Sequence, residues 1–342
     1  MQAFIIFDDG EIIEGCAFGA AGTVCGELVF NTSMGGSREI VSDPAYFGQI
    51  VTLTYPLTAE WGGDGDGRPG AAAMICREEF DVNNEPGHID GFLKQRGVIG
   101  IGGIDTRHIA TKLREAGRVV KAVCTTESMN KDAAGALIKD FEIKNATGSV
   151  SVNDIKKFGE GSRSVAVLDF GYNENMLNSL IKRGCSITLL PHNTPAESIL
   201  AGGYGLLVLS NGPGNPAENN GYIETIKTLC GKIPMLAIGL GMQILALAQG
   251  GSVSRLPVGH RGANIPVKST ASNRIYITAQ NHGYAVDSCP DSGEISYVNV
   301  NDGTVAGIDY KDINAVSVQF LPESEPGPID AGFIYDDILK KL

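Results

Sequence analysis

The chain has 342 residues, which is enough for two domains that each bury their own core. Lys and Arg total 27 against 39 Asp and Glu, so the formal charge is −12, and no basic run is present to follow a nucleic-acid backbone. We therefore expect no nucleic-acid partner. The longest apolar stretch, residues 235–248, is interrupted by Gly239 and Gly241 and is too short to span a bilayer. With no signal-peptide pattern at the N-terminus, we expect a cytoplasmic protein without a membrane span.

Residues 1–125 contain short, β-branched apolar runs separated by turn residues, and this pattern predicts a mostly-β domain. The clearest helix of this half is predicted within residues 104–117. Asp105 or Thr106 is suited to cap its first turn, and Gly117 is suited to end it.

A polar segment rich in Gly and Ser separates the two halves of the chain. It predicts an N-terminal domain of residues 1–150, a linker of residues 151–163 and a C-terminal domain of residues 164–342. In the C-terminal half, apolar runs alternate with amphipathic helical segments, for example around residues 220–230. This alternation indicates an α/β domain with a largely parallel, doubly wound sheet covered by helices on both faces.

Two loops of the C-terminal half lie where such sheets bind ligands, at the carboxyl ends of strands. The sequence SNGPG at residues 210–214 follows one apolar run, and Gly239 follows another and precedes a helical segment. Taken alone, SNGPG is more often an ordinary Gly/Pro turn. Its position at a strand end beside the second loop favours a binding site.

Several motifs carry a resemblance to known families. SNGPG, Gly241-x-Gln243, QNHG at residues 280–283 and Pro322-Glu323 resemble the motifs of class I glutamine amidotransferase domains. Further motifs, in the same order along nearly the whole chain, resemble the small subunit of carbamoyl phosphate synthetase. They lie at residues 26–56, 103–117, 168–177, 259–267 and 301–307.

This resemblance implies a glutamine-hydrolysing carbamoyl phosphate synthase made of two different subunits. The small subunit hydrolyses glutamine and passes ammonia through a tunnel to a large synthetase subunit, which binds ATP and Mg²⁺. The product enters arginine and pyrimidine biosynthesis. We expect this chain itself to hold no cofactor and no metal.

The chain departs from the family at the catalytic triad. The family places its nucleophilic Cys in a Gly-x-Cys-x-Gly-His-Gln turn, where this chain has Gly239 at the Cys position and Met242 at the His position. The family's His-Pro-Glu motif contains the His that shuttles the proton, and this chain has Leu321 at that position. Of this motif's catalytic side chains, only the orienting carboxylate remains, as Glu323. Glutamine hydrolysis needs both a nucleophile and a base, so we expect this activity to be lost.

The resemblance also implies a glutamine pocket around these positions. The backbone N–H groups of Gly212 and Leu240 match the family's oxyanion donors. Other pocket positions match Gly214, Gln243, Asn281, Gly283 and Tyr284. Ala45 replaces a Ser that usually contacts glutamine, and Ile329 replaces a common His. We expect a vestigial pocket for L-glutamine or another small amide.

No other residue in the sequence replaces the lost groups. His282 matches a family His outside the triad, and we expect it to have a hydrogen-bonded structural role. None of the seven cysteines follows a strand and opens a helix as the nucleophile must. Their spacing indicates neither a disulfide framework nor a zinc site.

Three functional hypotheses remain. The first is a non-catalytic small subunit that supports carbamoyl phosphate formation from free ammonia by a large subunit, and the retained motif at residues 103–117 favours it. The second is an enzyme that hydrolyses glutamine or another amide by an unassigned route. The third is a stand-alone pseudo-amidotransferase that binds a different small ligand in a pocket enlarged at Gly239.

Overall fold

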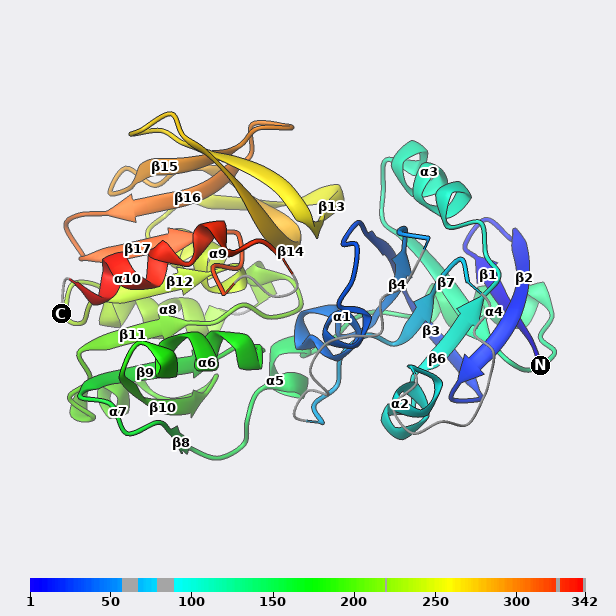
Figure 1. Cartoon of the computed structure of the whole chain (residues 1–342), viewed down its shortest axis with the longest axis horizontal. Helices are drawn as coiled ribbons and strands as arrows, with labels where there is room; N and C mark the ends of the chain where they lie inside the picture. Colours follow the sequence, from blue (N-terminus) through cyan, green and yellow to red (C-terminus); the bar gives the residue numbers. More distant parts are fainter. Residues whose placement is uncertain (57–66, 79–88, 219, 324–326, 341–342) are drawn as a thin grey trace. The chain divides into compact units, whose positions relative to one another are not determined.

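The structure is a computed structural model of the whole chain, and it describes all residues except 57–66, 79–88, 219, 324–326 and 341–342. The chain divides into two compact units, Met1–Ala146 and Thr147–Leu342 (Figure 1). None of the described helices is long and apolar enough to cross a membrane.

The first unit is built on a closed barrel of β-strands. Its strands are β1 (Gln2–Phe7), β2 (Ile12–Gly19), β3 (Thr23–Asn31), β4 (Gln49–Leu53), β5 (Ala73–Ile75), β6 (Ile99–Gly102) and β7 (Val120–Thr125). Around the barrel the order is β1-β2-β6-β5-β4-β3-β7, with β3, β4, β5 and β6 mutually parallel. The interior is filled by alternate side chains such as Ile5, Ile50 and Ile101, all fully buried. The prediction of a mostly-β N-terminal domain is confirmed.

Short helices surround this barrel: α1 (Ser37–Ser42), η1 (Pro44–Tyr46), α2 (Ile89–Arg96), α3 (Thr106–Ala116) and α4 (Lys131–Asp140). The side chain of Asp105 accepts hydrogen bonds from two backbone N–H groups in the first turn of α3. Gly117 ends the helix in a left-handed conformation, with φ 59°. Ile109 and Leu113 turn toward the barrel core, as their spacing of four residues predicts.

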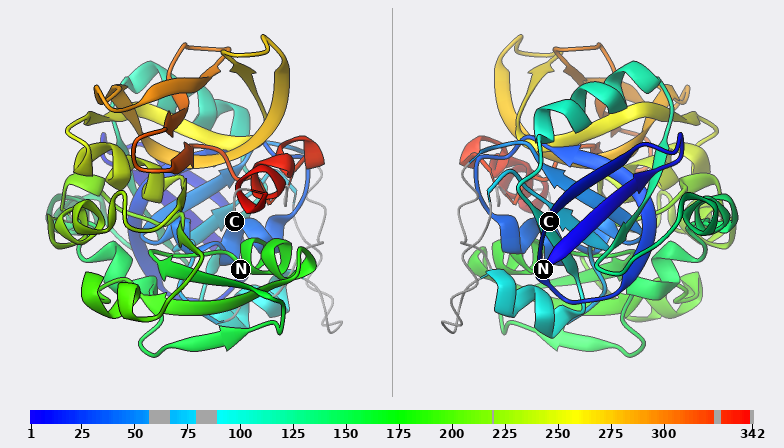
Figure 2. Two further views of the ribbon diagram at one scale, coloured as in Figure 1. Left: turned by 90° about the vertical axis from the view of Figure 1, so that its left-hand side faces the viewer. Right: turned by 90° about the vertical axis from the view of Figure 1, so that its right-hand side faces the viewer.

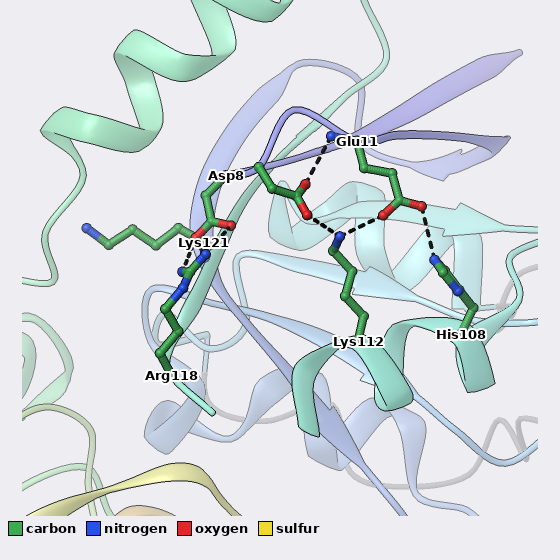
Figure 3. Close-up of polar contacts among 7 residues, drawn as sticks. Asp8, Glu11, His108, Lys112, Arg118 and Lys121 are labelled. Atoms are coloured by element: carbon green, nitrogen blue, oxygen red, sulfur yellow. Dashed lines mark hydrogen bonds and ion pairs between the residues drawn. The ribbon is translucent and has the colours of Figure 1, made fainter. Parts of the chain in front are cut away.

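Ion pairs attach α3 to the turn between β1 and β2 (Figure 3). Lys112 pairs with Asp9 and, at 2.7 Å, with Glu11. The ring nitrogen Nε2 of His108 lies 3.0 Å from the same Glu11 carboxylate, and Arg118, just beyond the helix, pairs with Asp8 at 2.5 Å. Within the motif at residues 103–117, Lys112 and His108 therefore contact acidic side chains of the same unit.

The second unit contains a ten-stranded sheet. Its strands are β8 (Lys156–Phe158), β9 (Arg163–Asp169), β10 (Cys185–Pro191), β11 (Leu206–Leu209), β12 (Met235–Ile238), β13 (Ser252–Ser269), β14 (Ile275–Ser288), β15 (Glu294–Asn299), β16 (Val305–Tyr310) and β17 (Ala315–Val318). The order is β14-β13-β15-β16-β17-β12-β11-β9-β10-β8. The central strands β17, β12, β11, β9 and β10 are parallel, and those outside them pair in antiparallel fashion. β8 lies within residues 151–163, the predicted linker, and extends this sheet at its edge.

Helices cover both faces of the second sheet. The helices after the first sheet strands are α6 (Glu174–Lys182), α7 (Ala196–Ala201), η2 (Pro216–Glu218), α8 (Asn220–Leu229), α9 (Leu240–Ala248), η3 (Ile329–Ala331) and α10 (Phe333–Leu339). A short helix, α5 (Ala146–Val150), spans the boundary between the two units. α6 and α10 contribute to one apolar core, whereas α7, α8 and α9 contribute to another. Figure 2 shows α10, in red, and α8, in yellow-green, on opposite sides of the sheet. The predicted doubly wound α/β domain is confirmed.

Candidate functional site

The parallel strands β9, β11 and β12 end at one edge of the second sheet, and their loops are fixed there by buried hydrogen bonds. The carboxylate of Asp169, fully buried at the end of β9, accepts from the backbone N–H groups of Val152, Gly171 and Tyr172 at 2.7 to 2.9 Å. The hydroxyl of Ser210, after β11, accepts from the N–H of the residue that follows Asp169, at 2.8 Å. These hydrogen bonds join the loops after β9 and β11.

A sharp strand-to-helix turn joins β12 to α9, and Gly239 occupies it. Its φ of 55° and ψ of −112° are angles that residues with a side chain rarely adopt. Two residues later, a Cβ at Gly241 would lie 2.4 Å from the carbonyl oxygen of Leu209, so glycine is required for the close approach of α9 to β11. Hydrolases place their nucleophile on a strained turn of this kind. The turn is therefore present here without a nucleophilic side chain.

The predicted oxyanion donors lie beside this turn. The backbone N–H of Leu240 donates to Oδ1 of Asn211 at 3.1 Å, and the Asn211 side chain is buried, with 6% of its residue surface exposed. Gly212 is packed so tightly that a Cβ there would lie 2.0 Å from the carbonyl oxygen of Phe170. The loop after β11 and the first turn of α9 are thus in direct contact.

The two remaining triad positions are buried but do not form a catalytic pair. Leu321 packs in the core shared with α10, and its N–H donates to the carbonyl oxygen of Ala279 at 2.9 Å. Glu323 accepts from Nδ2 of Asn173 at 2.6 Å and from the hydroxyl of Tyr335 at 3.0 Å. Burial, together with the adjacent Glu323 carboxylate, holds the pKa of Tyr335 well above its usual value, so the phenol remains a donor. The carboxylate is held by neutral donors.

The predicted pocket residues on α9 and β14 contact one another. Nε2 of Gln243 donates to the carbonyl oxygen of Tyr284 at 2.8 Å and to Oε1 of Gln319 at 3.1 Å. Asn281 and Gly283 lie on β14 beside Tyr284, and both Gln243 and Asn281 are buried. These contacts bind the helix after the turn to the antiparallel part of the sheet.

The remaining predicted positions lie in the loop after β11, in η1, in η3 and in α9. Gly214 is in the loop after β11 with φ 96°. Ala45 is in η1 of the first unit, where its N–H donates to the carboxylate of Asp43. Ile329 begins η3 and is 85% exposed. Met242 is fully buried in the core beneath α9, so its side chain contributes hydrocarbon packing.

His282 lies within β14 and is buried. Its Nδ1 is 2.7 Å from the carbonyl oxygen of Tyr284, and its Nε2 is 2.9 Å from Oε1 of Gln280. Burial, reinforced by the neighbouring His260, lowers the pKa of His282 to about 3. The ring is therefore a neutral, hydrogen-bonded structural element at ordinary pH.

Neither a thiol nor a metal centre is found at the turn within the described residues. The pKa of the Cys76 thiol is raised to about 12 by burial, and that of Cys25 to about 11. Among the residues that the structure describes, no group of three or more His, Cys, Asp or Glu side chains is placed to hold a metal ion.

Several contacting residues carried no usable signal in the sequence. Asn173, Tyr335 and Gln319 meet the predicted positions only because the fold brings distant segments together. Asn211 is part of the SNGPG motif, but nothing in that motif indicates that its side chain accepts from the N–H of Leu240.

Comparison with known families agrees with this architecture. Residues 166–341 match the family model for glutamine amidotransferase class-I, and residues 5–123 match that for the carbamoyl-phosphate synthase small chain, CPSase domain. The chain belongs to the carbamoyl phosphate synthase small chain family. Among its relatives, the small chain of Clostridium perfringens is 39% identical over 99% of both chains. That of Methanococcus vannielii is 41% identical over 99% of this chain and 96% of its own, and that of Methanocaldococcus jannaschii is 39% identical over 99% of both. As a member of this family, the chain has a small-chain domain followed by a glutamine amidotransferase domain.

Proposed function

We propose that this chain is a carbamoyl phosphate synthase small subunit that does not hydrolyse glutamine, and that it supports a large synthetase subunit using free ammonia. The observation that carries the proposal is Gly239. The strained turn that would present a nucleophile is retained, yet it bears no side chain able to attack an amide.

The absence of a base at the second triad position supports the same proposal. Leu321 offers only hydrocarbon, and Glu323 is bound by Asn173 and Tyr335. Triad members act as a unit: in subtilisin, loss of the nucleophile alone lowers kcat by about 10⁶. Loss of both nucleophile and base leaves no route through this site.

The match over full-length relatives supports a retained partner role. Both units are covered in relatives named small chain, so the part of the chain outside the amidotransferase domain is kept as well. We propose a heterodimer with a large subunit that binds ATP and Mg²⁺, acting in arginine and pyrimidine biosynthesis in the cytoplasm. Within the retained motif, Lys112 forms ion pairs with Asp9 and Glu11 of the same unit, so this side chain contributes to the structure of the first unit.

The experiment is reconstitution with the large subunit encoded in the same genome. The purified pair is expected to form carbamoyl phosphate from ammonium salts, with a rate that rises toward alkaline pH as NH₃ becomes more abundant, and to form none from glutamine. The large subunit alone serves as the control for the contribution of this chain. Equal rates with glutamine and ammonium would refute the proposal, and recovery of this chain without a large subunit would favour a stand-alone role.

A further inference from the structure

The side chain of Asn211 lies where a nucleophile would stand. A Cβ built on Gly239 would be 2.1 Å from Oδ1, 2.6 Å from Cγ and 3.2 Å from Cβ of Asn211. These are its three nearest neighbours, and all belong to one side chain. The carboxamide of Asn211 therefore fills the volume above the glycine at the turn.

The same carboxamide accepts a hydrogen bond from the N–H group of Leu240, which is one of the predicted oxyanion donors. Its Oδ1 accepts from the N–H of Leu240 at 3.1 Å. This N–H belongs to the first turn of the nine-residue helix α9, where backbone donors have no partner within the helix. A bound glutamine would present the same group, a primary carboxamide, to the same donor.

We propose that Asn211 is a built-in carboxamide ligand of this site, and that the site accepts a free primary carboxamide when the Asn211 side chain is removed. This inference rests on the proposed function, in which the turn has no nucleophile. A tethered amide competes at high effective concentration, so free glutamine is excluded from the Leu240 donor in the native chain. Glycine at 239 and the observed position of Asn211 are mutually dependent, because any Cβ at 239 displaces the carboxamide.

The first test is chemical rescue. Asn211→Gly removes the equivalent of one acetamide molecule. The matched control is Asn215→Gly in the same loop, whose side chain forms hydrogen bonds with Ala217 and Glu218. We expect the melting temperature of Asn211→Gly to lie several degrees below that of the native chain. Acetamide at ten times its Kd should raise the melting temperature of this variant by about 3 °C. Neither the native chain nor Asn215→Gly should show that rise. Equal responses of all three proteins would overturn the proposal.

The second test is a double-mutant cycle that combines Gly239→Cys with truncation of Asn211. If Asn211→Gly folds poorly, Asn211→Ala can be used as the truncation instead. Gly239→Cys should lower the melting temperature by about 3 °C more when Asn211 is present than when it is truncated. Peptide mapping should show that iodoacetamide alkylates the thiol introduced at position 239 at least about tenfold faster in the double variant. Additive melting shifts with equal alkylation rates would show that Asn211 does not occupy this volume.

Neither test measures glutamine hydrolysis. Glutamate release by the native chain would refute the proposed function whatever the cycle shows. An additive cycle would refute the role of Asn211 and leave the proposed function standing.

Discussion

Two regions of the second unit, the turn at Gly239 and the segment at Glu323, differ in opposite ways from the catalytic arrangement that we expect of the family. The turn keeps its backbone, with φ 55°, and lacks the side chain. The segment keeps the carboxylate, which now binds Asn173 and Tyr335. The comparison teaches that strand pairing and close packing hold the backbone of a turn without a functional side chain, whereas a buried carboxylate is held by its hydrogen-bond donors.

The largest expected effect comes from refilling both regions together. Gly239→Cys and Leu321→His, combined with Asn211→Gly, should raise glutamate release at least about 10³-fold over the native chain, because triad members act as a unit. Each single change should give almost no release. A combined variant that folds and remains inactive would show that the segment around Glu323 no longer supports a base at position 321.

Removing the Glu323 side chain should destabilise the protein more than replacing its carboxylate with a neutral amide. Glu323→Ala removes the acceptor of the half-buried Asn173 amide and of the buried Tyr335 hydroxyl, and it should reduce the free energy of unfolding by about 3 kcal/mol. Glu323→Gln keeps an oxygen for Asn173 and an amide that can donate to the Tyr335 hydroxyl, so its cost should be about 1 kcal/mol. Urea denaturation compares the two variants, and equal losses would contradict this account.

A side chain at position 239 should destabilise the protein even when that side chain is not reactive. Gly239→Ala combines positive φ with displacement of Asn211 and should cost about 2 to 3 kcal/mol. The control is Gly250→Ala, where φ is 88° and no atom lies within 4 Å of the added Cβ, with an expected cost of about 1 kcal/mol. A Gly239→Ala variant as stable as Gly250→Ala would mean that the volume above the turn is open.

The stability of the protein should depend on pH through the polar contacts that join α9 to β14. His282 and Gln243 share the carbonyl oxygen of Tyr284. Because the pKa of His282 is lowered to about 3, the unfolded chain binds a proton at higher pH than the folded chain does, and stability falls as pH decreases from 6.5 toward 3. Between pH 6.5 and 5 the expected loss is about 2 kcal/mol. His282→Gln should flatten this slope in urea titrations, and an unchanged slope would assign the effect to other groups.

Local rules predicted a large part of the fold. The cap at Asp105 and the stop at Gly117 are both observed, because side-chain capping and left-handed glycine act within one turn of helix. The alternating strands and helices after residue 164 likewise predicted the doubly wound sheet. Closure of the first unit into a barrel was not predicted, since it depends on β1 pairing with β7 over more than a hundred residues.

The motif pattern assigns Gly239 and Leu321 to the nucleophile and base positions, and this assignment stays a prediction. The side-chain contacts around these positions were not predictable from the sequence. The contacts of Glu323 with Asn173 join residues 150 positions apart, and the orientation of Asn211 depends on the missing Cβ of Gly239. Such long-range choices have no local sequence signature.

The most direct test of the central claim is glutamate release from L-glutamine by the native chain bound to its large subunit. The account predicts no release above the buffer control, while the same complex makes carbamoyl phosphate from ammonium salts. A glutamine turnover within about a hundredfold of an ordinary kcat of ~10 s⁻¹ would contradict it.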